Sequence, residues 1–286
     1  MFKEVITKSK TRQIVYLCFC AFVFASCSGG SNTNKEAEAL YNSAVEMNSA
    51  GNCEQSNRVL DSLSKTFPNE FELIKKGMHL RTLNGEKIIK KESVSNDSLI
   101  AVSKPVVEHL ANSFNYIKEA DMVEGFWMSK RLKRYAQSTS IEPRIDNNCE
   151  MYIVSNYVGG GIGHTSLSVV GGNGRVSTAT VPYDKARNYR YENEGKRYES
   201  ITFKPAECAA FVEAIAKNGG SPITISFNGA SSKSGKIDGN TTKAFQETLA
   251  YSEASKNLKK AQGKKIYLDK KLEITLKQQQ KTKVAN

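Results

Sequence analysis

The chain has 286 residues, a formal charge of +12, six cysteines and 39% hydrophobic residues. This apolar content is enough to build a core, which excludes wholesale disorder, and the length is typical of one or two domains. Six cysteines over this length exclude a disulfide-dense scaffold, and positive charge alone does not identify a nucleic-acid-binding protein.

Residues 1–26 have the three parts of an export signal. Basic residues between Lys3 and Arg12 precede an apolar run over residues 14–24, and small residues then meet Cys27. The apolar run is shorter than the roughly 20 residues that span a bilayer, so it is typical of a cleaved signal rather than a membrane anchor.

The Ala25-Ser26-Cys27 junction resembles the bacterial lipobox, although Phe24 stands where leucine is commonest. The resemblance implies a lipoprotein signal peptide over residues 1–26, lipidation of Cys27 and a flexible tether over residues 27–34. No acidic residue lies between Cys27 and Glu36, which favours an outer-membrane lipoprotein that faces the periplasm. The alternative is an ordinary signal peptide with a cysteine beside its cleavage site.

Residues 35–140 predict a helical region, in which apolar residues recur at helical spacing between breaks at Gly51 and Pro68. Its first two helices resemble one tetratricopeptide repeat, at Leu40, Ala44, Met47, Gly51, Ser56, Leu60 and Pro68. One repeat cannot form a peptide-binding solenoid, so the resemblance implies a helix pair that packs on neighbouring helices.

Residues 141–238 predict a β-rich domain, because apolar side chains alternate with polar ones around Ile153, Leu167 and Ile225. About six short strands with one helix over residues 205–217 favour a small antiparallel sandwich or open barrel. Residues 239–286 predict a long lysine-rich helix that packs back along the N-terminal helices. The fold class is therefore α+β.

This order of elements resembles a class of Bacteroides-type lipoproteins of unknown function. The shared features are the Leu-Asp-Ser-Leu helix at 60–63, the His-Thr-Ser-Leu strand at 164–167 and the Val-Pro-Tyr-Asp turn at 181–184. Two Asp-Ser-Leu triplets also resemble the O-glycosylation signal of such bacteria, which implies Ser62 and Ser98 as acceptors, although the first lies in a predicted helix.

Three cysteines remain after the signal and Cys27, namely Cys53, Cys149 and Cys208. Cys208 shares an apolar helix face with Phe211 and Ile215, which favours a buried thiol. A disulfide between Cys149 and Cys208 is the sharper alternative in an oxidising compartment. None of the spacings fits a metal site, and no cofactor is predicted.

The candidate ligand-binding residues are Tyr183, Arg187, Tyr189, Arg190 and Tyr191. Surfaces of interleaved tyrosines and arginines bind sugars, anionic glycans or single-stranded nucleic acid. Nucleic acid is not an expected partner outside the cytoplasm. The alternative is a turn whose tyrosines pair across strands.

The glycines before His164 are followed by a predicted strand rather than a helix, so they predict a mobile hairpin loop and not a phosphate-binding loop. His164 with Cys149 or Cys208 lacks the flanks of known cysteine enzymes. We therefore predict no catalytic residue, and a lipid-anchored envelope protein with a binding or scaffolding role. Its expected partners are the membrane and envelope proteins or glycan. The alternative is an envelope enzyme that acts on glycan or peptide through Cys208 or His164.

Removal of the signal leaves a charge of +9, and residues 256–283 hold ten lysines against two acidic residues. The basicity is thus local to the terminal helix, which predicts a solvated face or a contact with anionic lipid headgroups.

Overall fold

A computed structural model of the chain describes residues 32–120, 122–133, 138–171, 174–218 and 222–283. The predicted signal peptide, Cys27 and the first part of the tether lie outside the described residues. The chain divides into two compact units, Met1–Ile88 with Thr275–Asn286, and Ile89–Ile274. Five helices and two antiparallel sheets confirm the α+β class.

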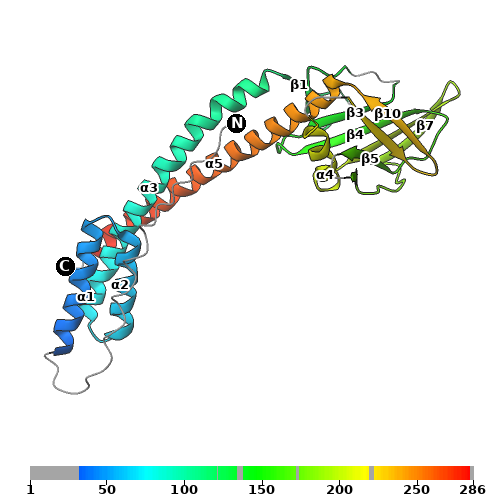
Figure 1. Ribbon diagram of the computed structural model, residues 1–286. Helices are drawn as coiled ribbons and strands as arrows, with labels where there is room; N and C mark the ends of the chain where they lie inside the picture. The colour runs from blue at the N-terminus through cyan, green and yellow to red at the C-terminus, as the bar shows by residue number, and fades with distance from the viewer. Residues whose placement is uncertain (1–31, 121, 134–137, 172–173, 219–221, 284–286) are drawn as a thin grey trace, which may run out of the picture. The chain divides into compact units, whose positions relative to one another are not determined.

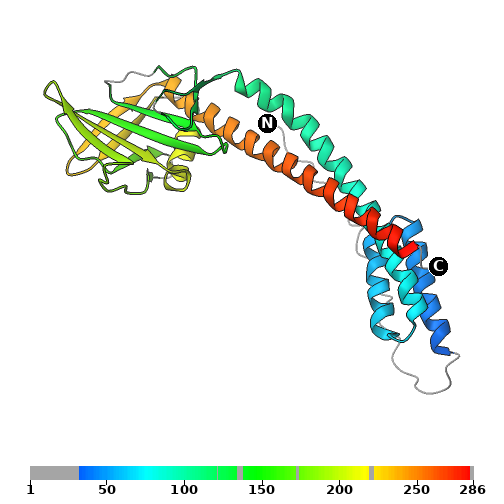
Figure 2. The same ribbon diagram turned by 180° about the vertical axis from the view of Figure 1, so that it is seen from behind.

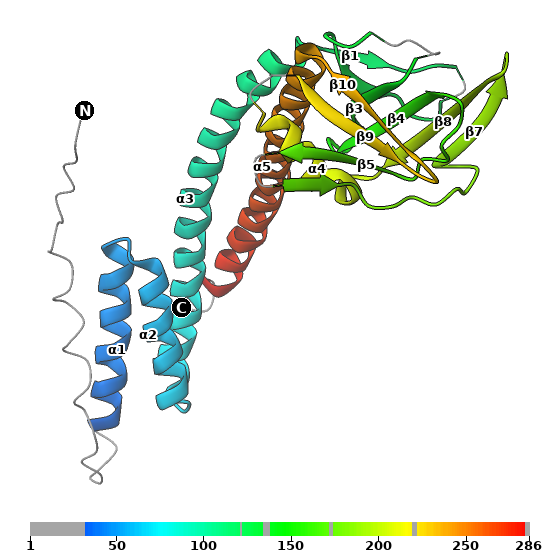
Figure 3. The same ribbon diagram turned by 45° about the vertical axis from the view of Figure 1, so that its right-hand side comes forward.

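The first unit contains the predicted helix pair, α1 (Asn32–Ser49) and α2 (Cys53–Thr66), beside the start of α3 (Phe71–Ala111) (Figure 3). Gly51 joins α1 to α2 at a φ of 79°, a conformation that glycine adopts without strain. The hydroxyl of Ser56 donates to the carbonyl of Ala44 across 2.7 Å, so small residues let the two helices approach closely. The apolar cluster between the helices is made of Ala37, Ala44, Leu60, Leu63 and Leu80.

Helices α3 and α5 (Gly239–Lys283) flank the β region in sequence and meet beside it in the second unit (Figures 1 and 2). The side-chain amide of Asn96 donates to the carbonyl of Ala261 across 2.9 Å, and Lys265 pairs with Asp97 at 2.8 Å. The long C-terminal helix expected from the sequence is therefore present, and within this unit it packs against the helix that precedes the strands.

The described residues of the β region form ten strands, where the sequence predicted about six. The six-stranded sheet has the order β1-β2-β3-β4-β8-β7, and the four-stranded sheet has the order β10-β9-β5-β6. The first sheet comprises β1 (Phe114–Ile117), β2 (Phe126–Ser129), β3 (Ser140–Ile145), β4 (Met151–Gly159), β8 (Lys196–Phe203) and β7 (Asn188–Asn193). The second comprises β10 (Ser232–Ile237), β9 (Ile223–Asn228), β5 (Ser166–Gly171) and β6 (Gly174–Ser177).

The helical region expected over residues 35–140 ends at Ala111, well before its predicted boundary. Two four-residue strands follow, and β1 pairs with β2 along its whole length. Phe114 of β1 packs on Tyr251 of α5 with ring centroids 4.7 Å apart. Trp127 of β2 packs against the same cluster. These apolar side chains are therefore buried by tertiary contacts with a helix more than 100 residues away in sequence.

One apolar core joins the two sheets and α4 (Pro205–Ala216). On β4, Ile153 and Tyr157 point into this core, and on α4 the core residues include Phe211 and Ile215. Because side chains alternate along a strand, Val154 and Asn156 lie on the opposite face of the six-stranded sheet. That second face carries the candidate site.

Candidate functional site

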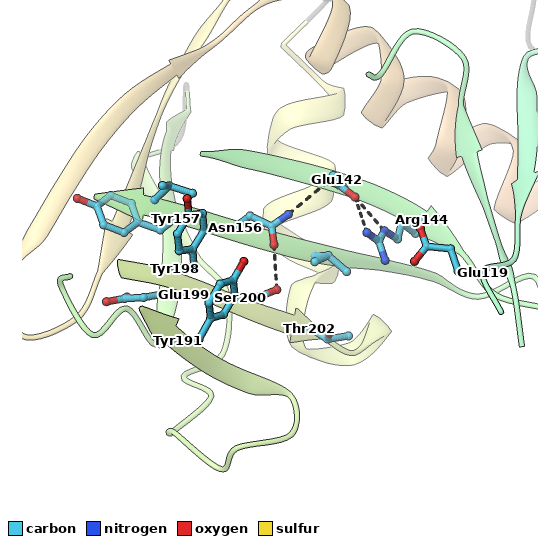
Figure 4. Close-up of a pocket in the computed structure, with 12 residues that line it drawn as sticks. Glu119, Glu142, Arg144, Asn156, Tyr157, Tyr191, Tyr198, Glu199, Ser200 and Thr202 are labelled. Atoms are coloured by element: carbon cyan, nitrogen blue, oxygen red, sulfur yellow. Dashed lines mark hydrogen bonds and ion pairs between the residues drawn. The ribbon is translucent and has the colours of Figure 1, made fainter. Parts of the chain in front are cut away.

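A cleft of about 600 Å³ lies over the face of the six-stranded sheet that points away from the core (Figure 4). We call it the sheet-face cleft; it runs from Glu142 and Arg144 on β3, past Asn156 on β4, to Tyr191 and Tyr198 on β7 and β8. The strand register explains this set, because Glu142 lies opposite Val154, Asn156 opposite Ser200, and Tyr198 opposite Tyr191. Directly paired residues share one face of a sheet.

A ladder of polar side chains crosses the floor of the cleft. The hydroxyl of Ser200 donates to Oδ1 of Asn156 across 2.9 Å. The amide of Asn156 donates in turn to the hydroxyl of Ser140 at 3.2 Å and to Oε1 of Glu142 at 3.3 Å. The ladder therefore joins strands β8, β4 and β3 side chain to side chain, and fixes the orientation of the Asn156 amide.

The charged end of the cleft holds Glu119, Glu142 and Arg144, and Arg144 is paired within it. Arg144 donates from Nε to Oε2 of Glu142 at 3.1 Å, and it also pairs with that oxygen through its terminal nitrogen. The guanidinium of Arg144 lies 3.9 Å from the ring centroid of Phe126, so it is also packed from one side. Burial raises the pKa of the neighbouring Tyr152, whose hydroxyl therefore stays neutral.

Aromatic rings form the other end of the cleft. The rings of Tyr191 and Tyr198 stack with centroids 4.7 Å apart and an interplanar angle of 5°. Tyr189 extends the group, with its ring centroid 5.8 Å from that of Tyr191. Tyr198 is only 6% exposed, whereas Tyr191 is 44% exposed and presents its ring to solvent. Tyr198 thus supports a half-exposed ring at the edge of the cleft.

The five residues predicted as one binding surface divide between two sides of β7. Tyr191 lines the sheet-face cleft and Tyr189 lies beside it. Arg190 alternates to the other side, where its terminal nitrogen donates to the carbonyl of His164 at 3.3 Å and its guanidinium lies over the ring of Tyr183. Arg187 donates to both carboxylate oxygens of Glu207, at 2.8 and 2.9 Å. The prediction of a single surface is wrong, because alternation along β7 places Tyr189 and Tyr191 on one face and Arg190 on the other, where it meets Tyr183.

His164 lies in a buried hydrogen-bonded row that the sequence did not reveal. Its Nδ1 donates to Oε2 of Glu199 at 2.9 Å, and its Nε2 lies 3.2 Å from the hydroxyl of Ser155. The carboxylate can only accept, so it fixes the tautomer and leaves Nε2 to accept from Ser155. The order hydroxyl–imidazole–carboxylate is that of a hydrolase triad. Ser155, His164 and Glu199 are each at most 1% exposed, however, so no substrate reaches the hydroxyl.

Glu199 also holds in place the loop of residues 160–164, which we call the glycine loop. Its carboxylate accepts backbone N–H groups from Ile162, Gly163 and His164 at 2.9, 2.8 and 2.7 Å. Gly163 has a φ of 62°, which allows consecutive N–H groups to converge on one carboxylate. The expectation of a mobile hairpin loop is therefore wrong for residues 162–164, whose backbone is tied to β8.

Opposing effects set the ionisation of this pair. Burial alone raises the pKa of Glu199, but the hydrogen bonds from His164 and from the loop backbone outweigh it and bring the pKa below its ordinary value. Burial lowers the pKa of His164, and this effect is larger than the opposing effect of the Glu199 carboxylate, which raises it. A neutral imidazole beside an ionised carboxylate is therefore the stable state near neutral pH.

Cys53, Cys149 and Cys208 are free thiols. Cys208 faces the core from α4, and burial together with Glu207 raises its pKa to about 12. Cys149 lies in the turn between β3 and β4, where its carbonyl accepts from Ser252 of α5 at 2.6 Å. The alternative, a Cys149–Cys208 disulfide, is not formed, and the inward face of α4 buries Cys208 among apolar side chains, as its apolar helix face predicted. His164 is hydrogen-bonded to Ser155 and Glu199 rather than to a thiol.

The two Asp-Ser-Leu triplets lie inside helices. The hydroxyl of Ser62 in α2 donates to the carbonyl of Arg58, and that of Ser98 in α3 donates to the carbonyl of Val94. Within the part of the chain that the structure describes, no helix is both long and apolar enough to cross a bilayer. The same residues contain no group of three or more His, Cys, Asp and Glu side chains placed to hold a metal ion.

Comparison of the chain with protein-family models, with curated proteins and with solved structures finds no match.

Proposed function

We propose that the chain is a lipid-anchored cell-envelope protein whose β region binds a ligand in the sheet-face cleft. The sequence around Cys27 supports the anchor, with the lipid on the thiol and the protein facing the periplasm from the outer membrane. Two or three acyl chains hold a protein stably, since each buried methylene contributes about 0.8 kcal/mol.

The observation that carries the binding role is the cleft itself. Its volume of about 600 Å³ lies within the range of small-molecule sites. It joins a half-exposed aromatic ring to a fixed row of polar groups, which is the combination that gives a binding site both contact area and orientation.

The placement of the reactive groups favours binding over catalysis. Cys208 and His164, the residues of the enzyme alternative, are both buried, and neither lines the cleft. A nucleophile must come within hydrogen-bond reach of a base in a site that substrate can enter. The Ser155–His164–Glu199 row has the hydrogen bonds but lacks the access.

Photo-crosslinking in the producing cells tests the binding role. A benzoyl-phenylalanine at position 191 replaces one exposed aromatic ring by another, and the same group at position 183 is the control. We expect crosslinked adducts at position 191 well above those at position 183. Equal labelling at the two positions contradicts a role for the cleft.

The anchor is tested separately by metabolic labelling with an alkyne fatty acid. We expect label and membrane retention in the wild-type protein and in Cys53→Ser, and loss of both in Cys27→Ser. A Cys27→Ser protein that keeps the label contradicts lipidation at this position.

A further inference from the structure

We propose that the ligand of the sheet-face cleft is an uncharged oligosaccharide, an assignment that rests on the binding function proposed above. Three properties of the cleft support this assignment: its charged side chains are already engaged, its floor is rich in hydroxyl and amide groups, and its tyrosines are stacked.

The contacts that the charged side chains already make argue against an ionic ligand. Arg144 is the one cation among the described residues that line the cleft, and Glu142 already holds it through two hydrogen bonds. An anionic ligand would have to displace that carboxylate. The carboxylates of the lining are engaged as well, Glu142 by Arg144, Glu199 by the glycine loop and Glu119 by a contact of its own, so a cationic ligand meets the same obstacle.

The strand order argues against an extended peptide lying in the cleft. Strand β4 pairs with β3 on one side and β8 on the other, and β8 pairs with β4 and β7. The backbone groups of these strands are therefore used within the sheet. A peptide laid across the face has no main-chain partners, which are the usual source of affinity for an extended peptide.

The floor suits a ligand that carries hydroxyl groups. Ser200 donates to Asn156, which leaves the lone pairs of its hydroxyl oxygen able to accept, and Thr202 presents a second hydroxyl on the same face. A sugar hydroxyl both donates and accepts, so it can join such a row without leaving a polar group unpaired. The orientation of the Asn156 amide is already fixed by its partners, so little side-chain freedom is lost on binding.

The tyrosines supply the apolar contact that a sugar ring needs. One face of a pyranose ring is lined by C–H groups, and it packs against an aromatic ring as an apolar surface. Tyr191 is half exposed, is backed by Tyr198 and has Tyr189 beside it. The ladder from Ser200 to Glu142 continues from these rings along the cleft, as Figure 4 shows. The length of this row favours a chain of sugars over a single one.

The test uses three fractions released from the envelope of the producing bacterium: neutral oligosaccharides, acidic oligosaccharides and peptides. Each is titrated into the purified full-length protein by calorimetry. We expect binding of the neutral fraction only. Binding of the acidic or peptide fraction in its place overturns the saccharide assignment and leaves the binding function standing. If no fraction binds, both proposals fall.

Variants locate the site. Tyr191→Ala should lower affinity for the neutral fraction roughly tenfold or more, as expected for loss of one stacking ring. Tyr191→Phe keeps the ring and should bind within a few-fold of wild type. Tyr183→Ala is the matched control, because Tyr183 is 46% exposed and lies on the other side of β7. Unchanged binding by Tyr191→Ala, or an equal loss in Tyr183→Ala, overturns the assignment to this cleft.

Discussion

The Nδ1 atom of His164 lies 2.9 Å from Oε2 of Glu199, and both side chains are fully enclosed. The carboxylate at the centre of this contact also accepts three backbone N–H groups from the loop between β4 and β5. The pair is therefore a structural clamp that joins β8 to this loop, behind the sheet that carries the cleft.

Replacing Glu199 by Gln should destabilise the protein strongly. The glutamine side-chain amide would place its own N–H groups against backbone N–H groups that now donate to the carboxylate. Each buried donor left unpaired costs about 1–3 kcal/mol of stability. We expect a loss of about 2–4 kcal/mol in the free energy of unfolding, measured by chemical denaturation. Glu213→Gln, on the exposed face of α4, is the control and should change little. A Glu199→Gln protein of wild-type stability would contradict the clamp.

Stability should fall on mild acidification. Burial lowers the pKa of His164 below its ordinary value of 6.5, so the unfolded chain binds more protons than the folded one between these two values. The free energy of unfolding therefore rises with pH in that window, by at most about 1.4 kcal/mol per pH unit. We expect lower stability at pH 5.5 than at pH 7.5, and a flatter profile in His164→Gln. A wild-type profile that is flat over this range argues against a buried neutral imidazole.

The thiol of Cys208 should resist alkylation in the native protein. Its pKa of about 12 and its 2% exposure leave almost no accessible thiolate at pH 8. Mass spectrometry after iodoacetamide treatment should find Cys208 unmodified in the folded protein. After denaturation without reductant, Cys53, Cys149 and Cys208 should all be modified. A peptide pair joined between Cys149 and Cys208 would restore the disulfide hypothesis.

Asn84 should contribute to the stability of the helix pair. Its buried side chain accepts from Asn48 at 2.6 Å and donates to Ser56 and Asn57 at 2.9 and 2.8 Å. Asn84→Ala leaves the amide of Asn48 without this acceptor, which should cost about 2 kcal/mol. The loss is measured by chemical denaturation, with exposed Asn69→Ala as the control. A loss no larger than that of the control would mean that apolar contacts alone hold the helices together.

Periodicity in the sequence predicted the helices and the longer strands. The buried residues of α2 recur at helical spacing and those of β4 largely alternate, so both patterns can be seen in the sequence. It missed β1 and β2, since strands of four residues carry too few alternations and are buried only by contact with α5. The expected tyrosine–arginine surface is divided because alternation along Asn188–Asn193 places Tyr189 and Tyr191 on one face of β7 and Arg190 on the other.

The remaining parts of the site depend on which strands pair, and local sequence patterns do not reveal this pairing. Ser155, His164 and Glu199 come together only because β4 pairs with β8, so Glu199 meets a loop 35 residues earlier in the chain. The Glu142–Asn156–Ser200 ladder likewise needs the register of three strands. No local pattern marks these residues as neighbours.

The central claim, that the sheet-face cleft binds a neutral oligosaccharide, is tested most directly by NMR. The side-chain amide of Asn156 lies in the cleft, whereas that of Asn188 is buried on the other face of the same sheet. Titration with the neutral oligosaccharide fraction should shift the Asn156 side-chain resonances in a saturable way and leave those of Asn188 unchanged. Asn156 resonances that stay in place at saturation, or that move together with those of Asn188, would contradict the account.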